Sequence, residues 1–359
     1  MNICSVVGAR PNFVKLAPLA RELAQRPQVT HCIIHTGQHY DPALTDAFFR
    51  DLEIPAPDHT LGIGSGTATD QTARTMLALE PLWLARRPDW VVVVGDVNAT
   101  LAATLTAVQC GLRVAHVEAG LRSFDRTMPE ETNRRLVDAV ADLLLTPSAD
   151  ADANLLREGI DPARIRRVGN IMVDSLLAAL PRAAQSPILD TLGLTPGQYA
   201  VVTLHRPSNV DDPATLRRLV QTLIQLARRL PVVFPVHPRT RTRMETLDLP
   251  DLTRLRCLPP LGYLDFLQLW RQARLVLTDS GGLQEETTVL GIPCLTLRTT
   301  TERPITVREG TNQVVGTEPA AILAAAEACL SGPFPLEPRR PELWDGHAAR
   351  RIADALLVG

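Results

Sequence analysis

Short apolar runs alternate with amphipathic stretches along most of the chain, and this alternation predicts the fold. In the first half, runs rich in Val, Ile and Leu are typical of buried strands. They cover residues 2–7, 29–35, 90–94, 113–117 and 143–146. A stretch with helical spacing follows each one, at 12–26, 42–52, 98–110, 129–140 and 149–158. Strands that alternate with helices in this way predict a parallel, doubly wound α/β sheet.

The alternation restarts after a segment at 181–197 that is marked by Pro, Ser and Gly, which we interpret as an interdomain or surface connection. Further strands are predicted at 199–204, 231–236, 254–258, 275–278 and 293–297. We therefore expect an N-terminal domain of residues 1–170 and a C-terminal domain of residues 171–345. A final helix within 346–359 is expected to cross back and complete the first domain.

Polar residues follow the predicted strands, at the end where parallel sheets bind ligands. They are Gly8-Ala-Arg10, Thr36-Gly-Gln-His39, Gly95-Asp-Val-Asn98, Glu118, His205-Arg206, His237-Pro-Arg239 and Asp279-Ser-Gly-Gly282. Because these strand ends come from both halves of the chain, they predict a ligand site in a cleft between two facing domains.

Acidic residues concentrate around one loop. Glu118 ends a strand, and Glu130 opens the helix that begins at Pro129, so both can face the same loop cavity. Carboxylates in a first helical turn are favoured by the helix dipole, so Glu130 and Glu131 alone are typical of a simple helix start. Asp96, one strand away, adds a third acid. Several acids in one cleft suit proton transfer at two faces of a substrate.

The segment Asp279-Ser-Gly-Gly-Leu-Gln-Glu-Glu286 lies between a predicted strand and a predicted helix. Ser280 is a good N-cap, and Gly281 and Gly282 let backbone N–H groups approach an anion closely. The carboxylate of Glu286 could accept both hydroxyls of a ribose. A simply capped helix is the alternative reading of the glycines alone.

Basic side chains from other segments add to this predicted anion site. Arg10 and Lys15 follow the first strand, and Arg303 lies in Thr301-Glu-Arg-Pro304. Together with the glycine-rich helix start they describe a clamp for a nucleotide diphosphate. His205, beside Arg206, could hold the diphosphate and stabilise its departure, although a lone histidine at a strand end is more often a structural hydrogen-bonding group.

Composition narrows the class of protein. The net charge is −2 without a long run of one sign, which argues against a nucleic-acid partner, and no apolar run reaches the length of a membrane span. Six widely spaced cysteines without a C-x-x-C pair indicate reduced thiols in the cytoplasm and no metal site. The first strand is not followed by G-x-G-x-x-G, and the chain has no G-x-x-x-x-G-K-[ST], so neither a bound dinucleotide nor ATP hydrolysis is expected.

Taken together, these segments resemble the non-hydrolysing UDP-N-acetylglucosamine 2-epimerase family. The matching pieces span nearly the whole chain in the family's order: Gly8-Ala-Arg-Pro11 with Lys15, Thr36-Gly-Gln-His39, Gly95-Asp96 with Asn98, His116-Val-Glu-Ala-Gly-Leu-Arg-Ser123, Pro129-Glu-Glu131 with Asn133-Arg134, His205-Arg206, Asp279-Ser-Gly-Gly-Leu-Gln-Glu-Glu286 and Thr301-Glu-Arg-Pro304. The resemblance implies an α/β fold of GT-B type, with two Rossmann-like parallel-sheet domains and the active site in the cleft between them. It also implies a homodimer.

The resemblance assigns roles to individual residues. The family's catalytic acids fall on Asp96, Glu118 and Glu130, and its essential histidine falls on His205. Its UDP contacts and the positions near them fall on Arg10, Lys15, Gln38, His39, Arg134, His237, Ser280, Gly281, Gly282, Glu286 and Arg303.

The implied reaction needs no cofactor. The C2 proton and UDP leave UDP-N-acetylglucosamine to give 2-acetamidoglucal, and both return to give UDP-N-acetylmannosamine for surface polysaccharide synthesis. Which acid serves which face of C2 stays open. The alternatives are an epimerase of a related UDP-sugar such as a UDP-diacetamido-uronate, a hydrolysing epimerase, a GT-B glycosyltransferase and a non-catalytic UDP-sugar sensor.

Two positions depart from the bacterial relatives that their own substrate activates. Those relatives carry a second polar residue three positions after the glutamine that matches Gln38, and an arginine two positions after the essential histidine. This chain has Asp41 and Pro207 there. We therefore predict weak or absent allosteric activation.

Overall fold

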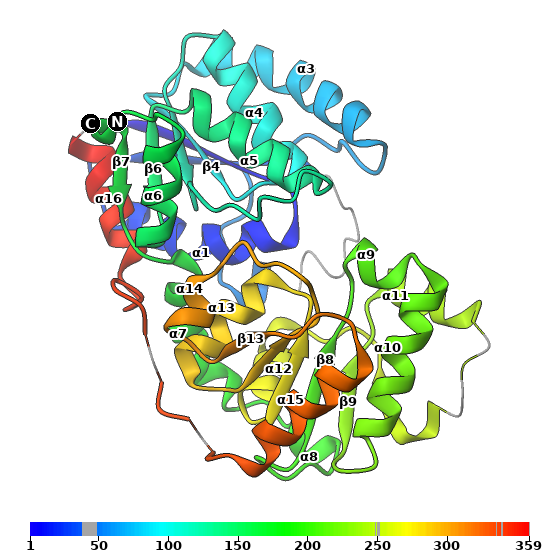
Figure 1. The fold of residues 1–359 in the computed structure, drawn as a ribbon. Helices are drawn as coiled ribbons and strands as arrows, with labels where there is room; N and C mark the ends of the chain where they lie inside the picture. The colour runs from blue at the N-terminus through cyan, green and yellow to red at the C-terminus, as the bar shows by residue number, and fades with distance from the viewer. Residues whose placement is uncertain (38–48, 248, 250–251, 335, 339, 359) are drawn as a thin grey trace. The chain divides into compact units, whose positions relative to one another are not determined.

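The structure is a computed structural model that describes residues 1–37, 49–247, 249, 252–334, 336–338 and 340–358. Its contacts divide the chain into two compact units (Figure 1). The N-terminal unit comprises Met1–Ala178 together with Glu342–Gly359, and the C-terminal unit comprises Ala179–Pro341. Each unit contains one parallel sheet.

The sheet of the N-terminal unit has the order β3-β2-β1-β4-β5-β6-β7, and all of its neighbouring strands are parallel. The strands are β1 (Asn2–Val7), β2 (Thr30–His35), β3 (His59–Thr60), β4 (Trp90–Val94), β5 (Val114–Val117), β6 (Leu143–Thr146) and β7 (Ile165–Arg167). The helices are α1 (Arg10–Ala24), α3 (Ala68–Arg86), α4 (Asn98–Gln109), α5 (Pro129–Val140), α6 (Ala149–Arg157), η1 (Pro162–Arg164), the start of α7 (Ile171–Ala183) and α16 (Ala348–Val358).

The last residues of the chain pack on the first. Helix α16 lies against α1, and Figure 1 shows the two chain ends at the same side of this unit. The indole Nε1 of Trp90 on β4 donates to the carbonyl oxygen of Leu356 at 3.1 Å. The Nε1 of the buried Trp344 donates to the carbonyl oxygen of Pro147 at 2.9 Å. The C-terminal segment is therefore part of the core of the N-terminal unit.

The sheet of the C-terminal unit repeats the same strand order as β10-β9-β8-β11-β12-β13, again entirely parallel. Its strands are β8 (Ala200–Thr203), β9 (Val232–Pro235), β10 (Leu255–Leu258), β11 (Leu275–Thr278), β12 (Cys294–Thr296) and β13 (Asn312–Val314). Its helices are α8 (Ile188–Thr191), α9 (Pro207–Val210), α10 (Pro213–Leu226), α11 (Pro238–Glu245), η2 (Leu252–Arg254), α12 (Tyr263–Arg271), α13 (Gly281–Leu290), α14 (Ile305–Arg308) and α15 (Pro319–Ser331).

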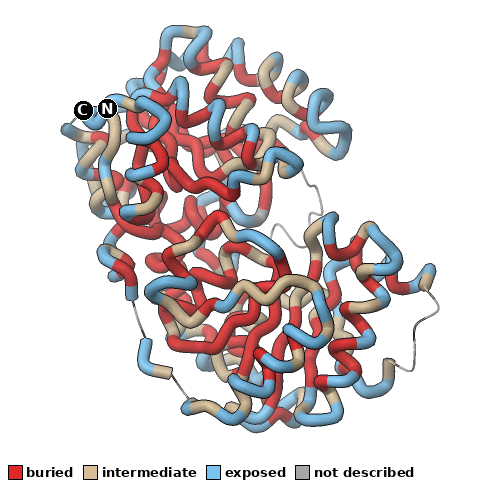
Figure 2. The backbone as a smooth tube through the Cα atoms, viewed as in Figure 1, coloured by how far each residue is buried: buried red, intermediate tan, exposed pale blue. Residues whose placement is uncertain are grey.

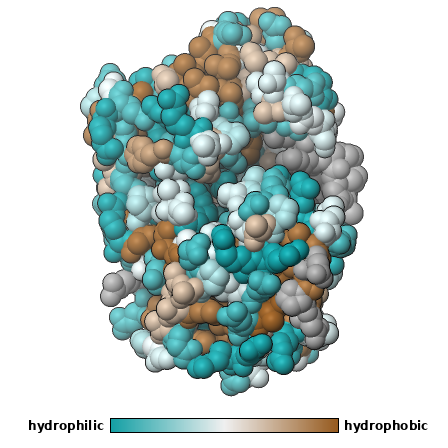
Figure 3. Space-filling view, turned by 45° about the vertical axis from the view of Figure 1, so that its right-hand side comes forward, coloured by the Kyte–Doolittle hydropathy of each residue, from teal (hydrophilic) through white to brown (hydrophobic). Residues whose placement is uncertain are grey.

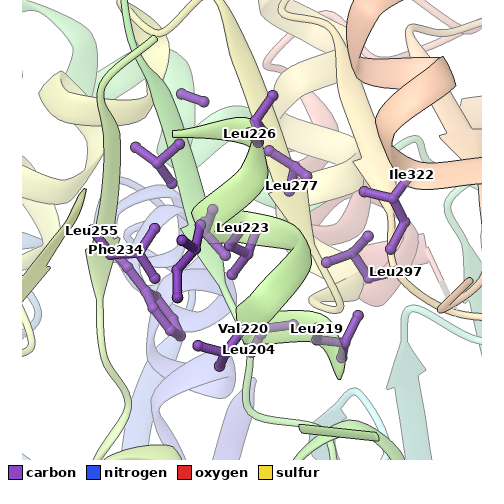
Figure 4. Close-up of a cluster of buried hydrophobic side chains, with 14 of the residues drawn as sticks. Leu204, Leu219, Val220, Leu223, Leu226, Phe234, Leu255, Leu277, Leu297 and Ile322 are labelled. Carbon is purple, nitrogen blue, oxygen red and sulfur yellow. The ribbon is translucent and has the colours of Figure 1, made fainter. Parts of the chain in front are cut away.

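The central strands of both sheets are buried, as Figure 2 shows by colour. Parallel strands covered by helices on both faces consist of almost continuous apolar residues, which is why the strand runs were visible in the sequence. In the C-terminal unit, helix α10 presents Leu219, Val220 and Leu223 to a core that includes Phe234 of β9 and Leu277 of β11 (Figure 4).

The strand order reverses once in each sheet. The reversal lies between β1 and β4 in the N-terminal unit, and between β8 and β11 in the C-terminal unit. Ligands of open α/β sheets bind at such a switch point, outside the carboxyl ends of the strands. The fold therefore directs attention to the residues that follow these four strands.

Most strands match their predicted ranges to within one or two residues. Strands β3, β7 and β13 and the long helix α3 were not predicted. Helix α3 buries Gln71 and Thr75 along with Leu79 and Trp83, so polar residues obscure its apolar period. The connection predicted at 181–197 contains the end of α7 and helix α8. Helix α7 continues through Pro181 and ends two residues later, since a proline in the last turn removes only one late hydrogen bond. The helix predicted at 42–52 lies largely outside the described residues.

Candidate functional site

Asn12 fixes the turn between β1 and α1. Its side-chain oxygen accepts hydrogen bonds from the backbone N–H groups of Gly8 and Ala9, both at 3.1 Å. Its amide nitrogen donates to the carbonyl oxygen of Val94, at the end of β4, at 2.9 Å. Asn12 thus joins the ends of the two strands that flank the switch point.

Lys15, one turn further along α1, forms a buried ion pair with Glu118. Gly95 leaves room for the lysine, because a Cβ atom at this position would lie 2.9 Å from its Nζ atom. Since Val94 and Val117 are register partners on adjacent strands, the residues after them lie side by side. The ends of β4 and β5 therefore bring Asp96 and Glu118 to one edge of the sheet.

Glu118 has a backbone conformation that is rare for a residue with a side chain. Its φ is +75°, in the left-handed region, at a cost on the order of 1–3 kcal/mol. Its backbone N–H and that of Ala119 both donate to the carbonyl oxygen of Leu145, at 3.0 and 3.2 Å. The chain turns sharply here, and the turn directs the carboxylate of Glu118 toward Lys15.

Arg134 of helix α5 connects two acids. Its Nε donates to Oδ2 of Asp96 at 3.2 Å, and its terminal nitrogens form ion pairs with Asp96 and Glu131. Asn133 supports the same loop by donating from its side chain to the carbonyl oxygen of Asp96 at 2.9 Å. Arg134, predicted to contact substrate, therefore also holds a candidate catalytic acid.

The two glutamates that open α5 occupy different surroundings. Glu131 is buried, and its carboxylate accepts hydrogen bonds from the N–H and hydroxyl of Ser123 at 2.9 and 3.0 Å. It therefore anchors the loop that precedes the helix. Glu130 is only half buried, at the second position of the helix. It lies in the same first turn, next to Glu131, whose carboxylate Arg134 and Ser123 contact.

A buried charged layer lies behind these acids. The ring of His116 contacts Asp138 through Nδ1 at 2.7 Å and the carbonyl oxygen of Gly95 through Nε2 at 2.8 Å. Arg122 donates to Asp138 at 2.7 Å and forms two hydrogen bonds with Glu158. Burial alone would raise the pKa of Asp138, but His116 and Arg122 hold it below its ordinary value.

In the C-terminal unit, Asp279 orients His205. The Nδ1 atom of His205 lies 3.0 Å from Oδ1 of Asp279, and the backbone N–H groups of His205 and Arg206 donate to the same carboxylate. Burial would raise the pKa of Asp279, but these partners keep it below its ordinary value. The imidazole edge that carries Nε2 is therefore the one left for a ligand. His237, the N-cap of α11, lies with its ring centre 5.9 Å from that of His205.

Helix α13 begins as the glycine motif predicted. Ser280 is its N-cap, and its side chain makes no capping hydrogen bond. A Cβ atom at Gly281 would lie 2.3 Å from Nη1 of Arg303, so only glycine allows this guanidinium to approach the helix start. Arg303 in turn forms ion pairs with Glu285 and Glu302 at 2.9 and 2.6 Å. Backbone N–H groups and an arginine meet at this point, which suits an anionic ligand.

Glu302 collects three arginines near the same helix start. It is buried and pairs with Arg303, with Arg298 at 2.8 Å and with Arg206 at 3.5 Å. Burial would raise its pKa, but the three guanidinium groups hold the pKa well below its ordinary value. The cluster carries more positive than negative charge, so its field favours an anion.

Glu286 lies next to Glu285 on helix α13, and its pKa is shifted in the opposite direction from that of Glu302. Burial, with a contribution from the charge of Glu285, raises the pKa of Glu286 to about 8. Glu286 also contributes to the raised pKa of Tyr263, which opens helix α12. At neutral pH the Glu286 carboxyl is protonated more often than not, so it can donate as well as accept hydrogen bonds.

The structure describes most, but not all, of the predicted site residues. Gln38, His39 and the side chain of Arg10 lie outside the described residues. The others come together in two groups, one in each unit. The N-terminal group contains Asp96, Glu118, Glu130, Lys15 and Arg134; the C-terminal group contains His205, His237, Ser280, Gly281, Gly282, Glu286 and Arg303.

Sequence reasoning missed the residues that orient these groups. Asp138, Asp279 and Glu302 are buried acids, and each contacts a histidine or an arginine of the site. Asp279 and Glu302 lie inside the motifs at 279–286 and 301–304, but nothing in their own spacing shows what they contact. Asp138 lies in a helix with no local signal at all.

No group of three or more His, Cys, Asp or Glu side chains among the described residues could hold a metal ion. Within that same part of the chain, every helix is too short or too polar to cross a bilayer.

A family model described as UDP-N-acetylglucosamine 2-epimerase matches residues 21–357. The chain belongs to this family. The site residues were predicted from the resemblance to this same family. The family match covers both the acids of the N-terminal unit and the glycine-rich helix start of the C-terminal unit.

Individual relatives agree with the family match. The UDP-N-acetylglucosamine 2-epimerase of Methanocaldococcus jannaschii is 41% identical over 340 residues, which are 92% of this chain and 93% of that protein. The UDP-2,3-diacetamido-2,3-dideoxy-D-glucuronate 2-epimerase of Pseudomonas aeruginosa is 39% identical over 360 residues, 99% of each chain.

Solved structures extend the agreement to the fold. The crystal structure of the M. jannaschii UDP-GlcNAc 2-epimerase in complex with UDP-GlcNAc and UDP matches with a TM-score of 0.93 and 39% identity over 100% of both chains. The predicted fold class, an α/β protein of GT-B type with two Rossmann-like parallel-sheet domains, is confirmed.

Proposed function

We propose that this family member interconverts UDP-N-acetylglucosamine and UDP-N-acetylmannosamine by inverting C2. The observation that carries the proposal is the pair of ion pairs at neighbouring strand ends, Lys15 with Glu118 and Arg134 with Asp96. They hold two carboxylates at one edge of the N-terminal sheet, and Glu130 opens the next helix. Inversion needs proton transfer at both faces of C2, which requires more than one such group.

In the proposed scheme, one carboxylate acts as the base that removes the C2 proton while UDP leaves C1. The C–H electron pair forms the C1–C2 double bond of 2-acetamidoglucal, and the electrons of the C1–O bond leave with UDP. A proton then returns to the other face of C2 as UDP returns to C1. We do not assign Asp96, Glu118 and Glu130 to particular faces.

The C-terminal group is proposed to hold UDP during this interval. Ser280, Gly281 and Gly282 supply the start of helix α13, and Arg303 lies against it. His205, fixed by Asp279, would donate from Nε2 to the diphosphate and so stabilise the leaving group. We assign Arg10, Gln38, His39 and His237 to the same ligand on the family resemblance alone.

The decisive experiment is incubation with UDP-N-acetylglucosamine in D2O, followed by NMR. We expect deuterium at C2, a signal of the C2 epimer and little free UDP. Free UDP that accumulates in step with the product would instead indicate a hydrolysing epimerase. Transfer to an added acceptor without deuterium at C2 would indicate a glycosyltransferase.

A second substrate is supported by one relative. The diacetamido-uronate epimerase of P. aeruginosa is nearly as similar to this chain as the M. jannaschii enzyme, and it covers more of the chain. The same D2O experiment with the UDP-diacetamido-uronate separates the two candidates. The physiological substrate is the one with the higher kcat/KM for C2 exchange.

We further propose a homodimer formed through helices α3, α4 and α5. These helices pack side by side, and their outer faces expose Leu77, Leu84, Val108, Leu136 and Val140. Leu77 is 71% exposed and Leu84 59%, two turns apart on one side of α3. Figure 3 shows apolar residues gathered over the upper part of the view, where the N-terminal unit lies. A two-fold dimer covers the same patch on both copies.

Sedimentation tests this dimer directly. Leu77→Glu with Leu84→Glu should give a monomer, because the patch would bury four charges in the two-fold interface. The matched control is Leu156→Glu, an exposed leucine on helix α6 of the same unit, which should leave the dimer intact. A wild-type monomer, or a dimer that survives both substitutions, would contradict the proposal.

The remaining proposals concern regulation and context. The rate curve with UDP-N-acetylglucosamine should be hyperbolic, since Pro207 opens helix α9 where activated relatives have an arginine, while Asp41 lies outside the described residues. A strongly sigmoidal curve would contradict this.

We also propose that the enzyme is cytoplasmic and supplies a UDP-sugar for surface polysaccharide synthesis. Cell fractionation would test the location, and the glycans of a deletion strain would test the role.

A further inference from the structure

His116 lies behind two of the proposed catalytic acids. Its ring is fully buried, on strand β5, two residues before Glu118. Nε2 lies 2.8 Å from the carbonyl oxygen of Gly95, the residue before Asp96. Nδ1 lies 2.7 Å from the carboxylate of Asp138. One imidazole therefore bonds to the backbone beside one acid and, through Asp138, to the turn that carries the other.

Both partners of this ring are hydrogen-bond acceptors. A carbonyl oxygen has no hydrogen to donate, so Nε2 must carry the proton in its bond to Gly95. Asp138 is an ionised carboxylate, since two N–H donors approach its second oxygen, so Nδ1 must donate as well. A neutral imidazole has only one N–H, which could satisfy one of these two bonds.

The surroundings supply the counter-charge that a buried cation needs. Asp138 carries a negative charge at 2.7 Å from the His116 ring, and Glu158 adds a second negative charge through Arg122. Arg122 donates to Asp138 and binds both oxygens of Glu158, at 2.9 and 2.7 Å, and the more exposed Arg135 reaches Glu158 at 3.6 Å. A direct ionic partner and full hydrogen bonding are the conditions under which a buried ion is tolerated.

We propose that His116 carries a proton on both ring nitrogens and positions Glu118 and Asp96 for proton transfer, acting through Asp138 and the carbonyl group of Gly95. This positioning role rests on the proposed epimerase function. His116 does not touch the substrate in this scheme. It fixes where the two carboxylates stand.

The turn after Glu118 explains why such a device is required. Asp138 accepts the backbone N–H of Gly120 at 3.1 Å, and Asn154 donates to the carbonyl oxygen of Gly120 at 3.0 Å. A Cβ atom at Gly120 would lie 2.5 Å from the carbonyl oxygen of Ala151, so the turn packs tightly against helix α6. These bonds hold Glu118 in its left-handed conformation, which the residue would otherwise leave.

The test is His116→Gln, because an amide side chain can replace one of the two ring hydrogen bonds and carries no charge. We expect kcat for C2 exchange to fall about 100-fold, the loss typical of a group displaced by 1 Å. KM and the Kd of UDP should stay close to the wild-type values, since the ring bonds to Gly95 and Asp138, neither of which is assigned to UDP. The matched control is His31→Gln on β2 of the same sheet, where the ring forms a hydrogen bond with the Ser5 hydroxyl at 2.8 Å. Its kcat should not change.

Asp138→Asn provides a second variant of the same shape, in case His116→Gln does not fold. It should lower kcat and leave the Kd of UDP unchanged. Full kcat in either folded variant would overturn the proposal. So would an equal loss of kcat and UDP affinity, which would indicate general structural damage.

A spectroscopic measurement separates this inference from the proposed function. In protein labelled with 15N-histidine, the His116 ring should show two protonated nitrogens at neutral pH, identified by their loss in His116→Gln. A neutral ring overturns the imidazolium even if the enzyme is active. Conversely, a wild-type protein that exchanges no UDP-sugar overturns the proposed function, and the charged ring would still be observed.

Discussion

The two units place acids and bases at the ends of their central strands in different proportions. In the N-terminal unit, Lys15 pairs with Glu118, and Arg134 is shared by Asp96 and Glu131. In the C-terminal unit, three arginines surround the carboxylate of Glu302, and one of them, Arg303, also pairs with Glu285. The first arrangement has at least as many acids as cations, and the second has an excess of cations.

This difference separates two uses of the same residue types. A carboxylate whose ion pair a bound substrate can change is suited to exchanging a proton. A carboxylate that serves three arginines organises the positive charge that an anionic ligand needs. Glu118 and Asp96 are therefore assigned to chemistry, and Glu302 is assigned to the architecture of the UDP site.

The largest expected effect is on the chemical side of this comparison. Glu118→Gln should lower the rate of C2 deuterium exchange about 10³-fold, the usual contribution of a general acid or base. The Kd of UDP, measured by calorimetry, should be unchanged, because Glu118 is assigned to proton transfer at C2 and not to a contact with UDP. Glu53→Gln, an exposed glutamate of the same unit, is the control. Full activity of Glu118→Gln would remove this residue from the mechanism.

The next effect tests the architectural role of Glu302. Glu302→Gln should lower the free energy of unfolding by about 3 kcal/mol, because it leaves three arginines without their shared partner. Since the folded-state pKa of Glu302 lies below its ordinary value of 4.5, its stabilisation is present above pH 4.5 and is lost as the pH falls toward the lowered value. The difference between the two proteins in urea denaturation should therefore shrink in acid.

Glu327→Gln is the control for this measurement, since Glu327 forms an exposed ion pair with Arg229. It should change the free energy of unfolding by less than about 1 kcal/mol at any pH. An equal loss in both variants, or a Glu302 effect that grows in acid, would contradict the assignment.

The smallest expected effect concerns Glu286, whose pKa is raised to about 8. Between pH 4.5 and pH 8 the folded protein holds a proton that the unfolded chain has released, so wild-type stability falls as the pH rises. Glu286→Gln removes this loss. Relative to wild type, the variant should gain about 2 kcal/mol between pH 6 and pH 8 and no more above that, as guanidinium denaturation would measure. A parallel pH dependence in the two proteins would show that Glu286 is already ionised at pH 6.

Much of the fold was predictable from the sequence for a physical reason. Parallel strands buried on both faces must be continuous apolar runs, and β1, β4 and β6 matched their predicted limits. Helix α3 was not predictable in the same way, because its inward positions include Gln71 and Thr75. Strand β3 has only two residues, too few to show an alternation.

The candidate site was predictable where a residue follows a strand or opens a helix. Glu118 and Ser280 stand at such points, and chain position alone made them visible. Asp138 and Asp279 act on residues far away in the chain: Asp138 reaches His116 across 22 positions, and Asp279 reaches the backbone of His205 across 74. Glu302 likewise reaches the distant Arg206, although Arg298 and Arg303 are its neighbours in the chain. Only the fold brings these partners together, so no local pattern could reveal them.

The return of the chain to its starting unit fixes an order of assembly during synthesis. The C-terminal unit is one continuous segment, Ala179–Pro341, so all its strands are synthesised in one uninterrupted stretch. The N-terminal unit begins first, yet it lacks Trp344 and helix α16 until that stretch has been made. The unit that holds the proposed catalytic acids is therefore completed after the other, and a message cut short before these codons would yield a finished C-terminal unit beside an unfinished N-terminal unit.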